Sequence, residues 1–183
     1  GIGQVADAYS IAFKITGLMY DLLIGGAIAA ALIPVLTGYR ERDEEEEGWK
    51  ALSTFINVVF AAMAFTAAMG IVFAPWIVPF FARGFDKETT DLTVSLIRIL
   101  FPSVAFLMLA GISNGILNSY KRFAAAAYGP TVYNLGSIAS IVFLSRYSIK
   151  AVAFGVMCSA AVYFLFQLSF ALKNLKFYRL KFY

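Results

Sequence analysis

Long runs without a charged side chain constrain the fold of this chain more than any other feature. Residues 51–82, 99–120, 123–145 and 151–172 contain no Asp, Glu, Lys or Arg, and residues 22–39 form a shorter fifth run. A helix needs about 20 apolar residues to cross about 30 Å of hydrocarbon. The runs lack the alternation of a membrane barrel strand. The sequence therefore predicts an all-α protein, a polytopic transmembrane helix bundle with about five membrane-spanning helices.

The expected helices cover approximately residues 5–39, 51–82, 90–120, 123–145 and 150–174. The loops between them are short, so residues 1–183 are predicted to form a single transmembrane domain. Composition agrees, because 14% of the residues are charged and a soluble domain has about 25%.

The distribution of basic residues predicts the orientation of the bundle. If the loops alternate across the membrane, nine basic residues lie on the side of the carboxy-terminal tail and four on the other. Basic loops face the cytoplasm, so the tail is expected there. Five spans would then leave Gly1 outside, which predicts that at least one helix precedes it.

Three charged residues occur in the first predicted helix at intervals of seven. Asp7, Lys14 and Asp21 would form one stripe with neighbours about 10.5 Å apart along the axis. A charge facing lipid costs about 2.5–3.5 kcal/mol on insertion scales. We therefore expect the stripe to face the bundle interior or a water-filled cavity, as a substrate or ion pathway. Alternatively, Asp7 favours a helix N-terminus, or Lys14 extends towards the headgroups.

Several small residues and prolines interrupt the predicted helices. Close packing between helices and bending both explain such residues. The residues expected to fill these roles are Gly17, Gly25, Gly26, Pro34, Gly111, Gly115 and Pro130.

No catalytic pattern is present. The chain has no His, which excludes HExxH zinc chemistry and a Ser-His triad, and it has no Walker A sequence. We predict no enzyme activity, no cofactor and no metal site. The tail KNLKFYRLKFY (173–183) alternates bases with aromatic residues and is expected to bind membrane lipids rather than nucleic acid.

Two ordered stretches carry a family pattern. They are GIGQVADAYSIAFKI with GGAIAAALIPVLTGY, and FPSVAFLMLAGISNGILNSYKRFAAAAYGPTVYNL. Both resemble the MurJ/MviN family of lipid II flippases. The matching residues of the first stretch are Gly1, Gly3, Asp7, Ala8, Ala12, Phe13, Gly26, Ala27, Pro34 and Tyr39. Those of the second are Phe101, Pro102, Gly115, Leu117, Asn118, Ser119, Arg122, Phe123, Pro130 and Asn134.

The resemblance implies a MATE-like fold of the MOP exporter superfamily, with two lobes and about fourteen helices. This chain would hold approximately the second to sixth helices, a partial amino-terminal lobe without the preceding helix and the second lobe. It also implies a multi-pass protein of the bacterial cytoplasmic membrane that flips the peptidoglycan precursor lipid II, a lipid-linked oligosaccharide, by alternating access. Asp7, Lys14 and Asp21 would line the cavity, with Arg98 and Arg122 as further pathway residues.

Two other interpretations stay open. The chain departs from the family pattern at Asp21, where a base is usual. An exporter of the same superfamily for drugs, polysaccharides or lipid-linked oligosaccharides, coupled to H⁺ or Na⁺, would use Asp7 and Asp21 to bind the ion. A non-transporting membrane module would use the charges only to specify helix pairing.

Overall fold

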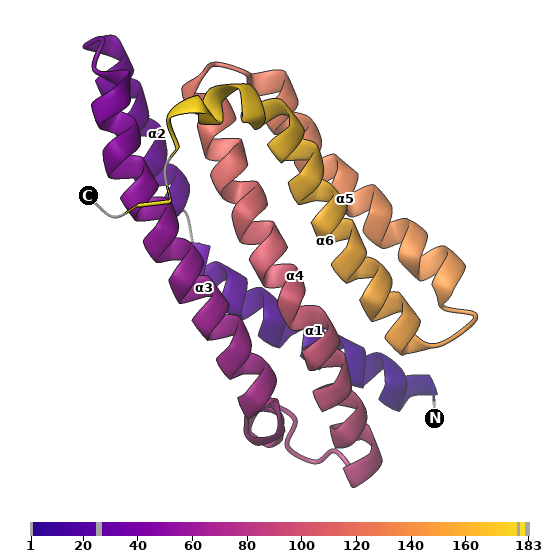
Figure 1. Cartoon of the computed structure of the whole chain (residues 1–183). Helices are drawn as coiled ribbons and strands as arrows, with labels where there is room; N and C mark the ends of the chain where they lie inside the picture. Colours follow the sequence, from indigo (N-terminus) through magenta and orange to yellow (C-terminus); the bar gives the residue numbers. More distant parts are fainter. Residues whose placement is uncertain (1, 25–26, 179, 182–183) are drawn as a thin grey trace.

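The computed structural model describes residues 2–24, 27–178 and 180–181, and every regular element in these ranges is helical. Figure 1 shows the elements in chain order. They are α1 (Ile2–Ile24), α2 (Ala27–Glu41), α3 (Glu45–Phe81), α4 (Lys87–Ser119), α5 (Phe123–Leu144), α6 (Ile149–Ala171) and the short 3-10 helix η1 (Leu172–Phe177). The prediction of an all-helical bundle is confirmed.

Helices α3 and α4 begin earlier than the charge-free runs, because charged residues form their first turns. Glu45, Glu46 and Glu47 open α3, where negative charge favours the positive end of the helix dipole. At α4, the Asp86 carboxylate accepts a hydrogen bond from the backbone N–H of Thr89 at 2.8 Å. This is an N-cap, which fixes where the helix starts.

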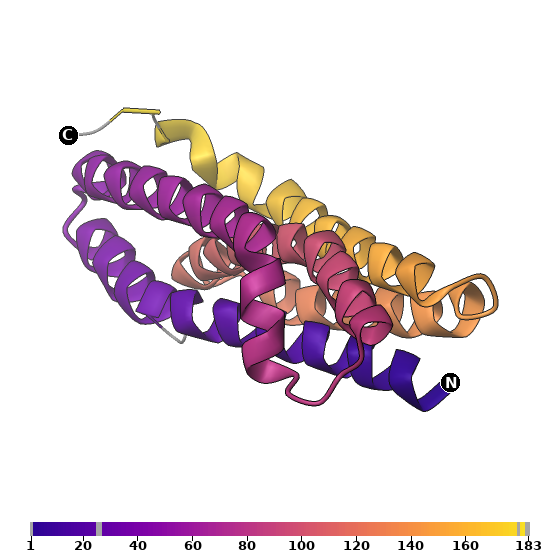
Figure 2. The same cartoon turned by 90° about the horizontal axis from the view of Figure 1, so that it is seen from below.

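Helix α4 lies at the centre of the bundle and packs against each of the other described α-helices. Its buried residues include Leu96, Ile97, Leu100 and Leu117, which are at most 1% exposed. Figure 2 shows α3 and α6 on one side of the molecule and α1 and α5 on the other. The core therefore follows the length of α4.

The first predicted helix, residues 5–39, corresponds to α1 and α2, which are described up to Ile24 and from Ala27. They run in different directions in Figure 1. Gly25 and Gly26, which were expected to bend or pack this segment, lie outside the described residues. Helix α2 continues through Pro34, whose ring is exposed.

Helices α3, α4 and α6 are long and apolar enough to cross a membrane. Large apolar side chains are exposed on the outer faces of these helices, such as Phe65 at 67% exposure and Trp76 at 68%. In water such a surface would be costly, whereas in lipid it is the expected one. The chain is part of a multi-pass membrane protein, and spans formed by α5 and by α1 with α2 remain predictions.

A proline in α5 releases a carbonyl group that joins three helices. Pro130 has no N–H, so the Ala126 carbonyl loses its partner in the helix. The amide nitrogens of Asn114 in α4 and Gln167 in α6 both donate to this carbonyl, at 2.8 and 3.0 Å. Gln167 is fully buried. Side chains of neighbouring helices therefore replace the missing backbone bond, as membrane proteins require.

Removing both amides is expected to destabilise the bundle. Asn114→Leu combined with Gln167→Leu leaves the Ala126 carbonyl without a donor, which costs about 1–3 kcal/mol. Either substitution alone should cost less, because the other amide remains. Adding Pro130→Ala to the double variant restores a backbone donor and should recover stability. Unfolding free energies in micelles measure this, and additive single effects without rescue would contradict it.

A polar cluster joins α2, α3 and α4 at one end of the bundle. The Arg40 guanidinium lies 4.2 Å from the centroid of the Tyr120 ring and donates to the Ser119 carbonyl at 2.5 Å. The Tyr120 hydroxyl donates to Glu45 and accepts from Trp49 Nε1 at 3.0 Å. Burial, with Glu45 adding to it, raises the pKa of Tyr120 to about 12. The cluster fixes the α2–α3 turn onto the end of α4.

Trp49 and Trp76 differ in burial. Their spacing predicts that both indoles lie at the depth of the membrane interfaces, and this stays a prediction. Trp49 is completely buried within the protein, while Trp76 is exposed. The hydrogen bond to Tyr120 explains why an indole N–H is stable inside the protein.

Candidate substrate path along α1

The charged stripe of α1 lies on the face away from the core. Ala8, Ala12 and Ile15 are buried, and α1 packs against α4. Asp7, Lys14 and Asp21 are all exposed. The described helices therefore do not enclose the stripe. That the stripe faces the interior of a larger bundle or a water-filled cavity stays a prediction.

A groove of about 280 Å³ lies beside the stripe. Its walls come from four helices, with Phe13, Thr16, Gly17 and Tyr20 from α1, Leu100, Ser103 and Leu107 from α4, Pro130 and Tyr133 from α5, and Tyr163 from α6. Gly17 is three residues from Lys14 and four from Asp21, and residues at these spacings are neighbours on a helix surface. The groove and the stripe therefore form one continuous face.

Three tyrosines give the groove its chemistry. Tyr20, Tyr133 and Tyr163 approach from three different helices, and the rings of Tyr133 and Tyr163 lie 6.4 Å apart. Thr16 donates to the Ala12 carbonyl at 2.8 Å and Ser103 to the Leu100 carbonyl at 2.5 Å. The Tyr163 hydroxyl interacts with Gln167 and Asn114, and the Tyr133 hydroxyl interacts with Ser137. A tyrosine combines an apolar ring with a polar tip. The groove therefore presents flat apolar walls with phenol groups.

Sequence reasoning did not single out these tyrosines. They occur far apart in the chain, and a ring in an apolar run is usually part of a core. A tyrosine within a charge-free span could have indicated a polar site in the sequence, because a buried tyrosine hydroxyl needs a polar partner.

Arg98, the next expected pathway residue, contacts α3. Its Nε donates to the Ile71 carbonyl at 3.3 Å. Pro75 stands four residues after Ile71 in α3, so this carbonyl has also lost its helical donor. Figure 2 shows the last turns of α3, which hold Pro75, running across the rest of the helix. The arginine joins α4 to α3 at this bend.

Arg122 lies apart from the stripe. It is exposed in the link between α4 and α5, next to Lys121. An open hollow of about 540 Å³ lies there between the two bases and the rings of Phe123, Tyr128, Phe166 and Phe170. A role for Arg122 at the mouth of a pathway remains a prediction.

The glycines expected to allow close helix packing differ in how near the neighbouring helices come to them. A Cβ on Gly115 would lie 3.0 Å from Leu32 Cδ2, so α2 packs closely against α4 there. No described atom outside the helix lies within 4 Å of the corresponding position at Gly17 or Gly111. Close helix packing therefore explains Gly115 and does not explain the other two. Pro130 is exposed at the groove.

Comparison with known proteins identifies the family. The family model described as "Lipid II flippase MurJ" matches residues 1–183. The chain is 33% identical to the lipid II flippase MurJ of Burkholderia cenocepacia over 174 residues, which is 92% of this chain and 34% of that protein. It is 34% identical to the probable lipid II flippase MurJ of Treponema pallidum over 179 residues, which is 93% of this chain and 33% of that protein.

A solved structure shows the same arrangement of helices. Its title is "Lipid II flippase MurJ, inward closed conformation", and it superimposes with a TM-score of 0.74 at 25% identity, covering 98% of this chain and 37% of that one. The chain thus spans about a third of the length of these relatives. The family model covers the whole chain, and the chain belongs to the MurJ family of lipid II flippases.

Proposed function

We propose that the protein carrying this chain moves lipid II across the bacterial cytoplasmic membrane by alternating access. The observation that supports this is the match of the family model to the whole chain. The chain would form most of an amino-terminal lobe, and α1 would turn its stripe towards a cavity shared with a second lobe. The exposed positions of Asp7, Lys14 and Asp21 fit such a cavity, because lipid would penalise them.

The charges of the stripe limit how far α1 alone could bind an anionic substrate. Lipid II carries an anionic pyrophosphate, and the stripe offers one base, Lys14, between two acids. Further bases for the pyrophosphate would come from parts of the protein outside this chain. The tyrosine groove is suited to the sugar portion, because aromatic faces and phenol hydroxyls together contact apolar and polar surfaces. The two acids are then available for a coupling ion, H⁺ or Na⁺.

The orientation of the protein follows from its basic residues. The side with Arg40, Arg42, Lys50, the α4–α5 link and the tail would face the cytoplasm, because this side carries the larger number of bases. Arg122 would then stand at the cytoplasmic mouth of the pathway.

Reconstitution tests the transport function directly. The full-length protein in vesicles should move fluorescent lipid II between leaflets faster than protein-free vesicles do. The control is a preparation with demonstrated flippase activity under the same conditions. Absence of protein-dependent movement, with the control active, would contradict the proposal.

Cysteine labelling tests whether the stripe lines a water-filled cavity. In a Cys158→Ser background, single cysteines at positions 7, 14 and 21 of the full-length protein should react with a water-soluble thiol reagent. A cysteine at position 65 should stay unreactive, because Phe65 lies on the apolar outer surface at 67% exposure. Failure at all three stripe positions would favour a non-transporting role.

A further inference from the structure

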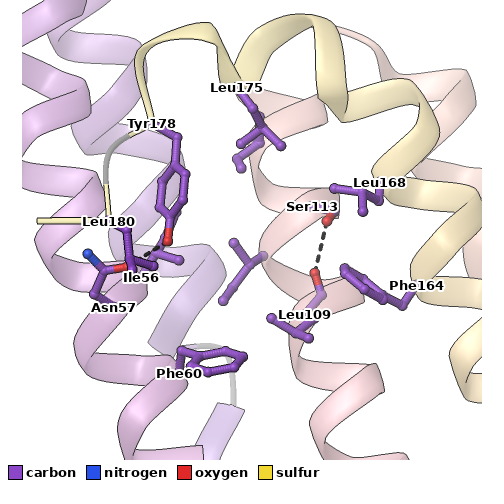
Figure 3. A pocket seen from close by; sticks show the side chains of 12 residues that line it. Ile56, Asn57, Phe60, Leu109, Ser113, Phe164, Leu168, Leu175, Tyr178 and Leu180 are labelled. Atoms are coloured by element: carbon purple, nitrogen blue, oxygen red, sulfur yellow. Dashed lines mark hydrogen bonds between the residues drawn. The ribbon is translucent and has the colours of Figure 1, made fainter.

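A second cavity lies on the opposite side of α4 from the stripe. It has a volume of about 550 Å³, within the range of about 300–1,000 Å³ that is usual for ligand pockets. Figure 3 shows side chains from three spanning helices and the tail around it. They include Phe60 of α3, Leu109 of α4, Phe164 and Leu168 of α6, and Leu175 and Leu180 of the tail.

The walls of this tail-covered cavity suit a hydrocarbon chain. Its three polar side chains are already bonded within the protein. The Ser113 hydroxyl donates to the Leu109 carbonyl at 2.9 Å, and the Tyr178 hydroxyl donates to Asn57 Oδ1 at 2.6 Å. Figure 3 draws both bonds. The Asn57 amide nitrogen donates to the Lys181 carbonyl at 3.1 Å. A sugar or phosphate inside would displace these bonds, whereas an acyl chain leaves them intact.

The cavity lies at the depth of lipid acyl chains. It is enclosed by α3, α4 and α6, the three helices that are long and apolar enough to span a membrane. On α4 its lining begins at Leu109, ten residues before the helix ends at Ser119, which corresponds to about 15 Å. The cavity therefore occupies the half of the membrane next to the tail.

The tail carries positive charge next to the cavity. Lys173 and Lys181 are exposed and stand within two residues of Leu175 and Leu180, which line the cavity together with Tyr178. The described tail residues 172–178 and 180–181 contain no acid. The nearest acid along α3, Glu47, is ten residues from Asn57, or about 15 Å, which exceeds the screening length of about 8 Å in physiological salt. The charge next to the cavity thus complements an anionic headgroup.

We propose that the tail-covered cavity binds one acyl chain of an anionic glycerophospholipid of the surrounding leaflet. The headgroup lies against the bases of the tail, and the chain occupies the space between α3, α4 and α6. The bound lipid holds the tail across α3 through Tyr178 and Leu175. This site is separate from the substrate path, which lies on the other side of α4.

Photo-crosslinking tests this site in the full-length protein. The vesicles contain phosphatidylethanolamine and phosphatidylglycerol, with a trace of phosphatidylglycerol that carries a diazirine on one acyl chain. Crosslinks should concentrate on Phe60, Phe164 and Leu168 over the exposed Phe143 of α5. The same probe with a phosphatidylcholine headgroup should label the cavity several-fold less, because each base near an anionic surface changes affinity by about fivefold.

Variants locate the site. Leu168→Trp fills the cavity and should reduce labelling of Phe60, whereas Leu165→Trp, on the outer face of α6 at 60% exposure, should not. Lys173→Gln with Lys181→Gln should remove the preference for phosphatidylglycerol. Equal labelling of cavity and outer residues, or equal labelling by the two headgroups in the unaltered protein, would overturn the proposal. Displacement of the probe by a polyprenyl phosphate would also overturn it, because the cavity would then hold a substrate-like chain.

Discussion

Asp21→Asn is expected to reduce lipid II transport to the rate of protein-free vesicles. The substitution keeps the size of the side chain and removes its charge, so the amide introduced at position 21 neither releases a proton nor balances a sodium ion. Asp21 is exposed on the open face of α1, so the substitution is not expected to disturb the packing of the bundle. The measurement is the initial rate of fluorescent lipid II movement, over a range of pH and Na⁺ concentration.

The matched control for this prediction is Asp91→Asn. Asp91 is an exposed acid near the start of α4, outside the stripe, and its loss should leave the transport rate unchanged. The unfolding midpoint of both variants should equal that of the unaltered protein. A full transport rate in Asp21→Asn, with an unchanged response to pH and Na⁺, would show that this carboxylate is not part of the coupling site.

Gly70→Ala should give the largest loss of stability among the glycine substitutions of α3. A Cβ at position 70 would lie under 3.0 Å from three carbons of the Phe101 ring, closer than real Cβ contacts allow. Phe101 is 1% exposed in the core around α4. Overpacking of this kind costs about 1–3 kcal/mol, occasionally more. The free energy of unfolding in micelles or bicelles measures the effect.

Gly111→Ala is the matched control, since no described atom outside α4 lies within 4 Å of the added Cβ. It should leave stability unchanged or raise it by up to about 1 kcal/mol, because alanine restricts the unfolded chain and favours helix. Phe101→Leu in the Gly70→Ala background should recover part of the loss by removing ring atoms from the contact. Equal stability of the two alanine variants would contradict the close α3–α4 contact.

The helices were predictable from the sequence because the membrane imposes long apolar runs. The predicted helices 90–120 and 150–174 correspond closely to α4 and α6. The apolar pattern continues through residues 5–39 and does not indicate the different directions of α1 and α2, although Gly25 and Gly26 between them were expected to allow bending or close packing. The sequence predicts starts of α3 and α4 that are too late, because charged residues suggest a loop where they in fact form the first helical turn.

The candidate site was less predictable than the fold. Spacing by seven correctly aligns Asp7, Lys14 and Asp21 on one face, but spacing alone does not say which face meets α4. The buried Ala8, Ala12 and Ile15 decide this, and small alanines carry a weak apolar signal. The tyrosine groove and the Arg98–Ile71 contact each join residues of different helices. Such proximity depends on the tertiary packing, which one sequence does not reveal.

The central place of α4 has a consequence for how the described helices move. Every other described α-helix packs against α4. If these helices moved as two independent groups, one group would have to lose its contacts with α4. Such a rupture would expose the fully enclosed side chains of Leu96, Ile97 and Leu117. Opening and closing of a pathway should therefore tilt α1 to α6 together, with the flexing placed in connections beyond them.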